Sequence, residues 1–130
     1  MPNIRVYCPV FPSEDHEKVM RAVKNIFPDM EPETTDNAIS GETAKLEHFA
    51  AQIRRQRILD TARSVLMKGR RGEERTVFNM NKQAAFAGKI SFTEERTILG
   101  TINVTITADN ITGYIEALAP TTVDGEEVPI

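Results

Sequence analysis

Strict alternation of apolar and polar residues over 101–107 constrains the fold of this chain more than any other feature. Ile102, Val104 and Ile106 alternate with threonine and asparagine, which is typical of a strand with one buried face and one face in water. Residues 3–11 alternate in the same way. Strands of this kind predict a mainly antiparallel sheet with one open face.

Apolar residues at helical spacing separate these strands. A helix is predicted from a cap at Ser13 to a stop at Pro28. The longest helical signal covers 43–68 and ends at Gly69. Its two apolar stripes are out of phase across 52–56, so this helix either bends there or buries more than one face.

Shorter elements complete the pattern. Asn81 caps a short helix over 82–87, and Asp109 caps the last helix. Short strands are expected as a pair within 29–41 and singly over 75–79 and 89–92. The order of elements predicts one α+β domain over residues 1–130, a mainly antiparallel sheet with helices packed on one face.

A single cysteine and the absence of long apolar runs exclude several classes of protein. One cysteine among 130 residues excludes a disulfide within the chain and a zinc site built from several cysteines. No apolar run approaches the ~18 residues that span a bilayer, so no membrane partner is expected. Residues 1–15 carry no basic-then-apolar signal pattern, and we therefore expect a cytoplasmic protein.

No arrangement of reactive side chains points to catalysis. Cys8 lies on the apolar side of its strand without an activating base, so we expect a buried, inert thiol. His16 and His48 lack the spacing of metal ligands, and the pair Gly88-Lys89 lacks the other residues of a phosphate-binding loop. The sequence predicts a protein that is not an enzyme and has no metal, cofactor or small-molecule substrate.

Positive charge is concentrated in the middle of an acidic chain. The formal net charge is −3 and the pI is about 5.4, which disfavours a uniformly basic nucleic-acid binder. Residues 54–75, however, contain eight basic and three acidic residues. Contact with a polyanion would have to use this segment. The alternative is a solvated helix face that acidic neighbours neutralise.

Three polar residues of the basic segment have a structural interpretation. Asp60 is three residues from both Arg57 and Arg63, so on a continuous helix it would bridge the two guanidinium groups. Arg55 falls within the apolar arc of that helix. This position predicts a partner carboxylate on another element or another subunit.

Short motifs follow one another in a characteristic order: RRQRILD at 54–60, AR at 62–63, NKQAA at 81–85, LAP at 118–120 and DG at 124–125. This order resembles an archaeal family of uncharacterised proteins predicted to associate with the RNA-processing exosome. The resemblance implies an α+β fold similar to the ribosomal protein that binds the small RNA of the large subunit. It also implies homodimers, with RNA as a candidate partner.

The leading interpretation is an RNA-binding or RNA-processing accessory protein that contacts phosphates. Its candidate contacts are Arg54, Arg57, Lys68, Arg70, Arg71 and Lys82. The alternative is a dimeric interaction or scaffold protein with no nucleic-acid role. In that case the structural polar residues are Arg55, Asp60, Arg63 and Asn81.

Overall fold

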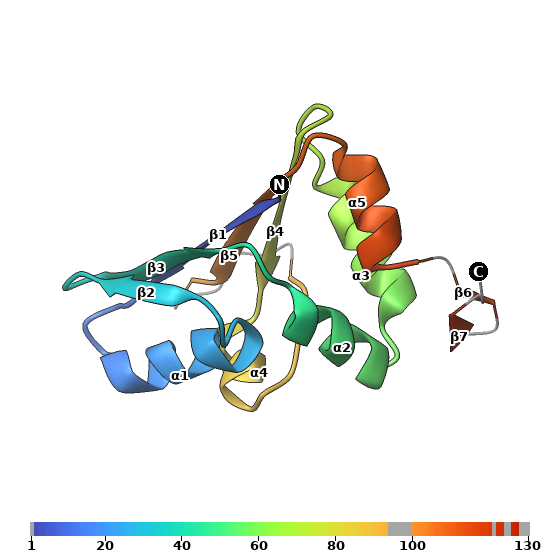
Figure 1. Cartoon of the computed structure of the whole chain (residues 1–130). Coiled ribbons are helices and arrows are strands. Elements are labelled where there is room, and N and C mark those ends of the chain that lie inside the picture. Colours follow the sequence, from blue (N-terminus) through green and yellow to red (C-terminus); the bar gives the residue numbers. More distant parts are fainter. Residues whose placement is uncertain (1, 94–99, 121, 124–125, 128–130) are drawn as a thin grey trace.

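The molecule is built around one antiparallel sheet. The structure is a computed structural model that describes residues 2–93, 100–120, 122–123 and 126–127. Its sheet has five strands in the order β2-β3-β1-β5-β4 (Figure 1). These strands are β1 Asn3–Pro9, β2 Glu31–Thr34, β3 Ala38–Thr43, β4 Arg75–Met80 and β5 Ile102–Thr107. A separate two-stranded pair consists of β6 Thr122–Val123 and β7 Glu126–Glu127.

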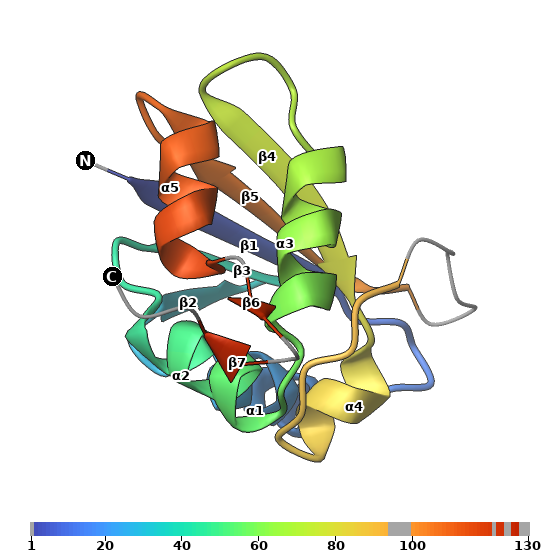
Figure 2. The same cartoon turned by 90° about the vertical axis from the view of Figure 1, so that its right-hand side faces the viewer.

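The helices cover one face of the five-stranded sheet. Those within the described residues are α1 His16–Ile26, α2 Glu47–Arg55, α3 Leu59–Lys68, α4 Lys82–Phe86 and α5 Ile111–Leu118. Figure 2 shows α3 and α5 side by side in front of the sheet, with α1, α2 and α4 toward one end. The predicted α+β class, with a mainly antiparallel sheet, is confirmed.

Alternation along the strands decides which side chains face the helices. Ile4, Val6 and Cys8 on β1 are fully buried, whereas Arg5 and Tyr7 between them are exposed. The apolar residues of β5 are buried in the same way and add to the same core. The other face of the sheet, which we call the open face, therefore presents the polar half of each strand.

Some element boundaries differ from the sequence prediction. Asp15 caps α1 in place of Ser13, and Asn110 caps α5 in place of Asp109. A capping side chain must reach a free amide of the first helical turn. The sequence pattern locates the start of a helix only to within a residue or two, so the residue that makes this bond differs from the predicted one at both helices. β1, the central strand of the sheet, ends at Pro9, two residues before the alternation over 3–11 stops.

The predicted strand over 89–92 is wrong. Within it, Phe92 alone makes a bridge, to Met80 at the end of β4. The amide and carbonyl of Ile90 both bond to the side chain of Gln56, and Asn81 N donates to Ser91 O. Because a side chain takes up the backbone groups that strand pairing needs, this segment crosses the structure as an irregular connection.

A close approach of the main chain joins α3 to β4. A Cβ atom at Gly69 would lie 2.1 Å from the carbonyl oxygen of Val77, so no larger residue fits without moving the backbone. Next to it, Thr76 Oγ1 donates a hydrogen bond of 2.6 Å to Leu66 O. Gly69 has an ordinary helical backbone conformation, so glycine is required here for close packing and not for an unusual φ.

We expect Gly69→Ala to lower the free energy of unfolding by about 1–3 kcal/mol, because overpacking displaces α3 from β4. Urea unfolding measures the change. Gly72→Ala is the matched control, since Gly72 has open space around it and a φ of +77°, so its cost of about 1 kcal/mol comes from backbone strain alone. A Gly69→Ala protein as stable as the parent would contradict the packing argument.

Candidate nucleic-acid interface

The predicted helix over 43–68 is divided by a hydrogen-bonded break. α2 ends at Arg55 and α3 begins at Leu59. Between them, Gln56 Oε1 accepts hydrogen bonds of 2.8 Å from Gln52 Nε2 and Ile90 N, while Gln56 Nε2 donates 2.9 Å to Ile90 O. Of the two alternatives that the sequence left open, the bend is the one observed, and it is sharp enough to start a new helix.

The break moves the first group of predicted cations away from the rest. Arg57 adopts a φ of +57° and lies outside both helices; its amide donates to Arg54 O at 3.1 Å, but its exposed side chain makes no hydrogen bond or ion pair with another described residue. Arg54 is partly buried, and its Nη1 donates to Ala50 O and Leu118 O at 3.0 and 3.3 Å. Arg54 therefore ties α2 to the end of α5.

The break also changes the surroundings of Arg55 and Asp60. Arg55 is exposed, and within the described residues its Nη1 donates 3.1 Å to Gln52 Oε1, an amide and not a carboxylate; a carboxylate partner on another subunit stays a prediction. Arg57 precedes α3, so it is not one helical turn from Asp60. Arg63 Nη2 instead lies 3.7 Å from Glu116 Oε1 on α5.

A second group of cations lies together where α3 meets β4. This group, which we call the basic end, consists of the exposed side chains Lys68, Arg70, Arg71 and Arg75. The acidic residues Glu73 and Glu74 lie within the same connection, so the local charge is positive but partly offset. By helix rise, α3 separates the basic end from Arg57 by about 15 Å. The predicted cations thus form two surfaces and not one.

The backbone of the basic end is fixed by hydrogen bonds. Arg71 N donates to Arg75 O at 2.8 Å, and Val77 N donates to Gly69 O at 3.0 Å, so the connection folds back on itself. Arg70 Nε and Nη1 donate to Met67 O and Thr112 Oγ1, each at 2.9 Å. These contacts fix the backbone and the Arg70 side chain without neutralising its charge.

Lys82, predicted to contact RNA, is buried. Its side chain is 8% exposed, and Nζ donates to Glu14 Oε1 at 3.0 Å and to Pro9 O. The ammonium also lies 5.2 Å from the centre of the Phe11 ring. Lys82 therefore holds the start of α1 against α4 and does not belong to an exposed basic surface. The neighbouring cap is confirmed, since Asn81 Oδ1 accepts from Ala84 N at 2.9 Å.

The open face carries polar residues that sequence reasoning did not combine. Strand register aligns five side chains in one row across the sheet, Glu33, Ser40, Tyr7, Asn103 and Asn79. Alternation identified the exposed side of each strand, but residues so far apart in sequence meet only through pairing. Tyr7, on the outward side of β1, is 47% exposed.

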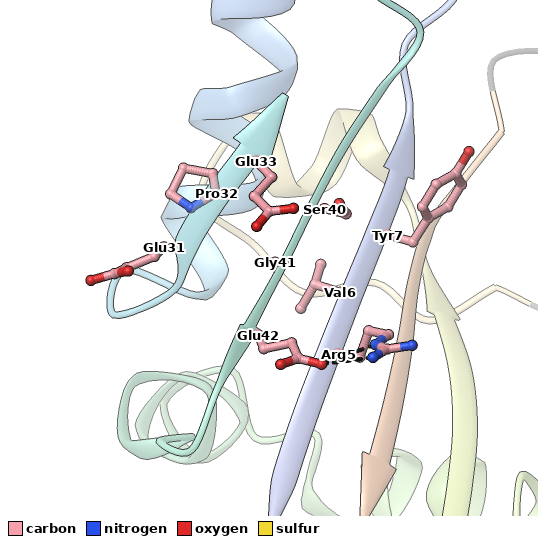
Figure 3. A pocket seen from close by; sticks show the side chains of 9 residues that line it. All are labelled: Arg5, Val6, Tyr7, Glu31, Pro32, Glu33, Ser40, Gly41 and Glu42. Atoms are coloured by element: carbon pink, nitrogen blue, oxygen red, sulfur yellow. Dashed lines mark hydrogen bonds and ion pairs between the residues drawn. The ribbon is translucent and has the colours of Figure 1, made fainter. Parts of the chain in front are cut away.

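One half of the open face is hollowed and acidic. A hollow of about 770 Å³ lies over β2, β3 and β1, where Glu31, Glu33 and Glu42 line it (Figure 3). Glu42 Oε1 accepts hydrogen bonds from Arg5 Nη2 at 2.8 Å and Arg5 Nε at 3.1 Å. The Arg5 guanidinium lowers the pKa of the Glu42 carboxyl, which stays charged at neutral pH.

Other sequence predictions concern reactive groups. Cys8 is fully buried, as predicted, and burial raises the pKa of its thiol to about 12. His16 is exposed, and its Nε2 lies 3.0 Å from Asp36 O. Across the described ranges, no three His, Cys, Asp or Glu side chains are grouped as metal ligands. None of the helices described has the length and apolar character needed to cross a bilayer.

Comparison with known proteins gives consistent similarities. Residues 3–108 match a family model described as RNA binding. A UPF0201 protein of Thermococcus onnurineus is 42% identical over 135 residues, which cover 98% of this chain and 97% of that protein. A UPF0200/UPF0201 protein of Archaeoglobus fulgidus is 40% identical over 97% of this chain, and the chain spans 40% of its length.

Solved structures share the fold. The crystal structure of a UPF0201 protein from Methanococcus jannaschii superposes with a TM-score of 0.90 at 36% identity, covering 98% of this chain and 99% of the other. A DUF54 protein from Archaeoglobus fulgidus gives a TM-score of 0.70 at 20% identity over 92% of this chain and 97% of the other, which is a likeness of fold alone.

We expect Lys82→Met to lower the free energy of unfolding by about 3–5 kcal/mol, because it leaves the Glu14 carboxylate buried without its partner. A double variant, Lys82→Met with Glu14→Leu, should recover much of the loss. Lys89→Met is the control, since Lys89 is exposed and its loss should cost under about 0.5 kcal/mol. Equal urea midpoints for Lys82→Met and Lys89→Met would show that the ion pair is dispensable.

We expect the stability of the protein to fall as pH rises from about 9 to 12 through Cys8. The unfolded thiol ionises near its usual pKa of 9.0, whereas the folded thiol keeps its proton to about 12. Ionisation therefore favours the unfolded state by up to about 1.4 kcal/mol per pH unit in this window. Urea unfolding at several pH values should show a shallower decline for Cys8→Ala. Identical pH profiles would exclude the effect.

Proposed function

This chain belongs to the UPF0201 family, and we propose that it acts as an RNA-binding protein without catalytic activity. The match to a family model described as RNA binding supports the ligand class. The observation that carries the proposal is the basic end, because its four exposed cations lie within eight residues, from the end of α3 to the start of β4, around a hydrogen-bonded connection. An accessory role in RNA processing is the finer form of the same proposal.

The basic end suits phosphates better than bases. Arg70 uses Nε and Nη1 within the protein, which leaves further guanidinium N–H donors for an incoming oxygen. Lys68 and Arg75 make no side-chain hydrogen bond or ion pair with another described residue. Contacts of this kind give affinity that depends strongly on salt and weakly on sequence.

The remaining predicted contacts have lesser parts in this proposal. Arg57 is exposed at the opposite end of α3 and provides a separate point of contact. Arg54 already donates to two carbonyl oxygens, so its role is mainly structural. Lys82 has no part in RNA contact because it is buried against Glu14.

A dimeric interaction protein with no nucleic-acid role is the second candidate. The observation that favours it is the acidity of the hollow, where Arg5 is paired with Glu42 and the remaining carboxylates, Glu31 and Glu33, would repel a phosphate chain. A homodimer, which the family resemblance implies, would give such a surface a partner. Light scattering on the purified chain measures the assembly, and RNA binding separates the two functions.

We expect the parent protein to bind single-stranded RNA with an affinity that falls steeply between about 50 and 200 mM salt. Arg71→Gln with Arg75→Gln should weaken binding and reduce the slope of log K against log salt by about 1.4, or ~0.7 for each phosphate contact. Fluorescence anisotropy of a labelled oligonucleotide measures both quantities.

Lys18→Gln with Lys45→Gln is the charge-matched control. Both lysines are exposed, and neither belongs to the connection between α3 and β4, so the double change should leave the slope unaltered. Absence of RNA binding at low salt and micromolar protein would refute the proposed function. Equal losses of RNA affinity in the two double variants would instead mean that binding depends on the net charge of the protein and not on a localised site.

A further inference from the structure

Three strands bring an aromatic ring and two amides together on the open face. Tyr7 on β1 lies opposite Asn103 on β5, and Asn103 lies opposite Asn79 on β4. Adjacent strands are ~4.8 Å apart, so the three side chains form a compact group about 10 Å wide. We call this group the Tyr7 row. No described helix covers this side of the sheet.

Tyr7 offers a ring for stacking. Tyr7 lies on the central strand of the sheet, yet 47% of its surface is exposed to solvent. In Figure 3 its ring lies on the β5 side of β1, away from the carboxylate of Glu33. Every nucleobase has a flat face, and stacking on an exposed aromatic ring is worth about 1–3 kcal/mol per base.

The two amides leave one donor group and one acceptor for a ligand. Asn79 Oδ1 accepts hydrogen bonds from Asn103 Nδ2 at 3.0 Å and from Thr101 Oγ1 at 3.1 Å. These bonds orient both amides. Among the described residues, nothing occupies Asn79 Nδ2 or Asn103 Oδ1. A donor beside an acceptor complements the hydrogen-bonding edge of a base.

Charge on the two sides of the Tyr7 row directs the phosphate chain. Because Arg5 is paired with Glu42, the carboxylates of Glu31 and Glu33 make the β2–β3 side repulsive to phosphate. On the other side, Arg75 shares the open face of β4 with Asn79 and lies four residues, or about 13 Å, along the strand. Arg5, the nearer cation on the open face, is paired with Glu42, whereas Arg75 belongs to the basic end, so unpaired positive charge continues from the row toward Arg75.

We propose that the Tyr7 row is a base-binding subsite for single-stranded RNA. This proposal rests on the RNA-binding function proposed above and adds the class of RNA to it. A base stacks on Tyr7 and bonds to the free amide atoms of Asn103 and Asn79, while the phosphates run toward Arg75. A duplex keeps its bases stacked on one another, so it reaches only the basic end.

Binding of a labelled single strand and of a duplex of equal length tests the subsite. Tyr7→Ala should weaken single-strand binding by about 5- to 150-fold, the loss of one stacked base, and leave duplex binding unchanged. Tyr7→Phe keeps the ring and should bind like the parent. Because Tyr7 is exposed, both variants should fold, and circular dichroism checks this. In the parent, the NMR signals of the Tyr7 ring should shift when the single strand is added.

Each remaining outcome has a distinct meaning. If Tyr7→Ala binds the single strand like the parent while Arg71→Gln with Arg75→Gln weakens it, the subsite is wrong and the proposed function stands. If the parent binds neither RNA at low salt, the proposed function fails. If Tyr7→Ala instead dissociates a dimer in light scattering, without a selective loss of single-strand binding, a second copy of the chain occupies the open face and the subsite is overturned.

Discussion

The architecture depends on the one-sided burial imposed by the alternating strands. β1 and β5 bury every second residue, so the helices must all share a single face of the sheet. A straight helix over 43–68 would be about 39 Å long, whereas the seven residues of β1 span about 23 Å. The side chain of Gln56 bonds to both backbone groups of Ile90. This contact lies at the end of α2, and α3 then begins in another direction.

The sequence was most informative where a pattern is local. Alternation in 101–107 predicted the strand, its buried residues and the antiparallel sheet, and Asn81 predicted its cap, because neighbours a few residues apart decide these features. The strand over 89–92 failed because the competing partner, Gln56, lies 34 residues away. Periodicity shows which secondary structure a segment favours, but not which distant side chain will form hydrogen bonds with its backbone.

The positions of charged side chains on the surface were harder to predict from the sequence than the helices and strands. The sequence located eight basic residues within 54–75 but not their positions in space, and the break at Arg57 and the length of α3 divide them. Lys82 lies one residue after a cap that was predicted correctly, yet its partner Glu14 is 68 positions away. The Tyr7 row was unpredictable for the same reason, since register alone brings β1, β5 and β4 together.

The margins of the sheet also limit how molecules of this protein meet in a crowded cell. β2 forms one margin and places Pro32, which has no amide donor, between two glutamates. At the other margin, Val77 N bonds to Gly69 O, and Asn79 O accepts from Thr93 N. A foreign strand thus finds charge and proline on one side and occupied groups on the other, so the sheet resists growth into fibrous aggregates.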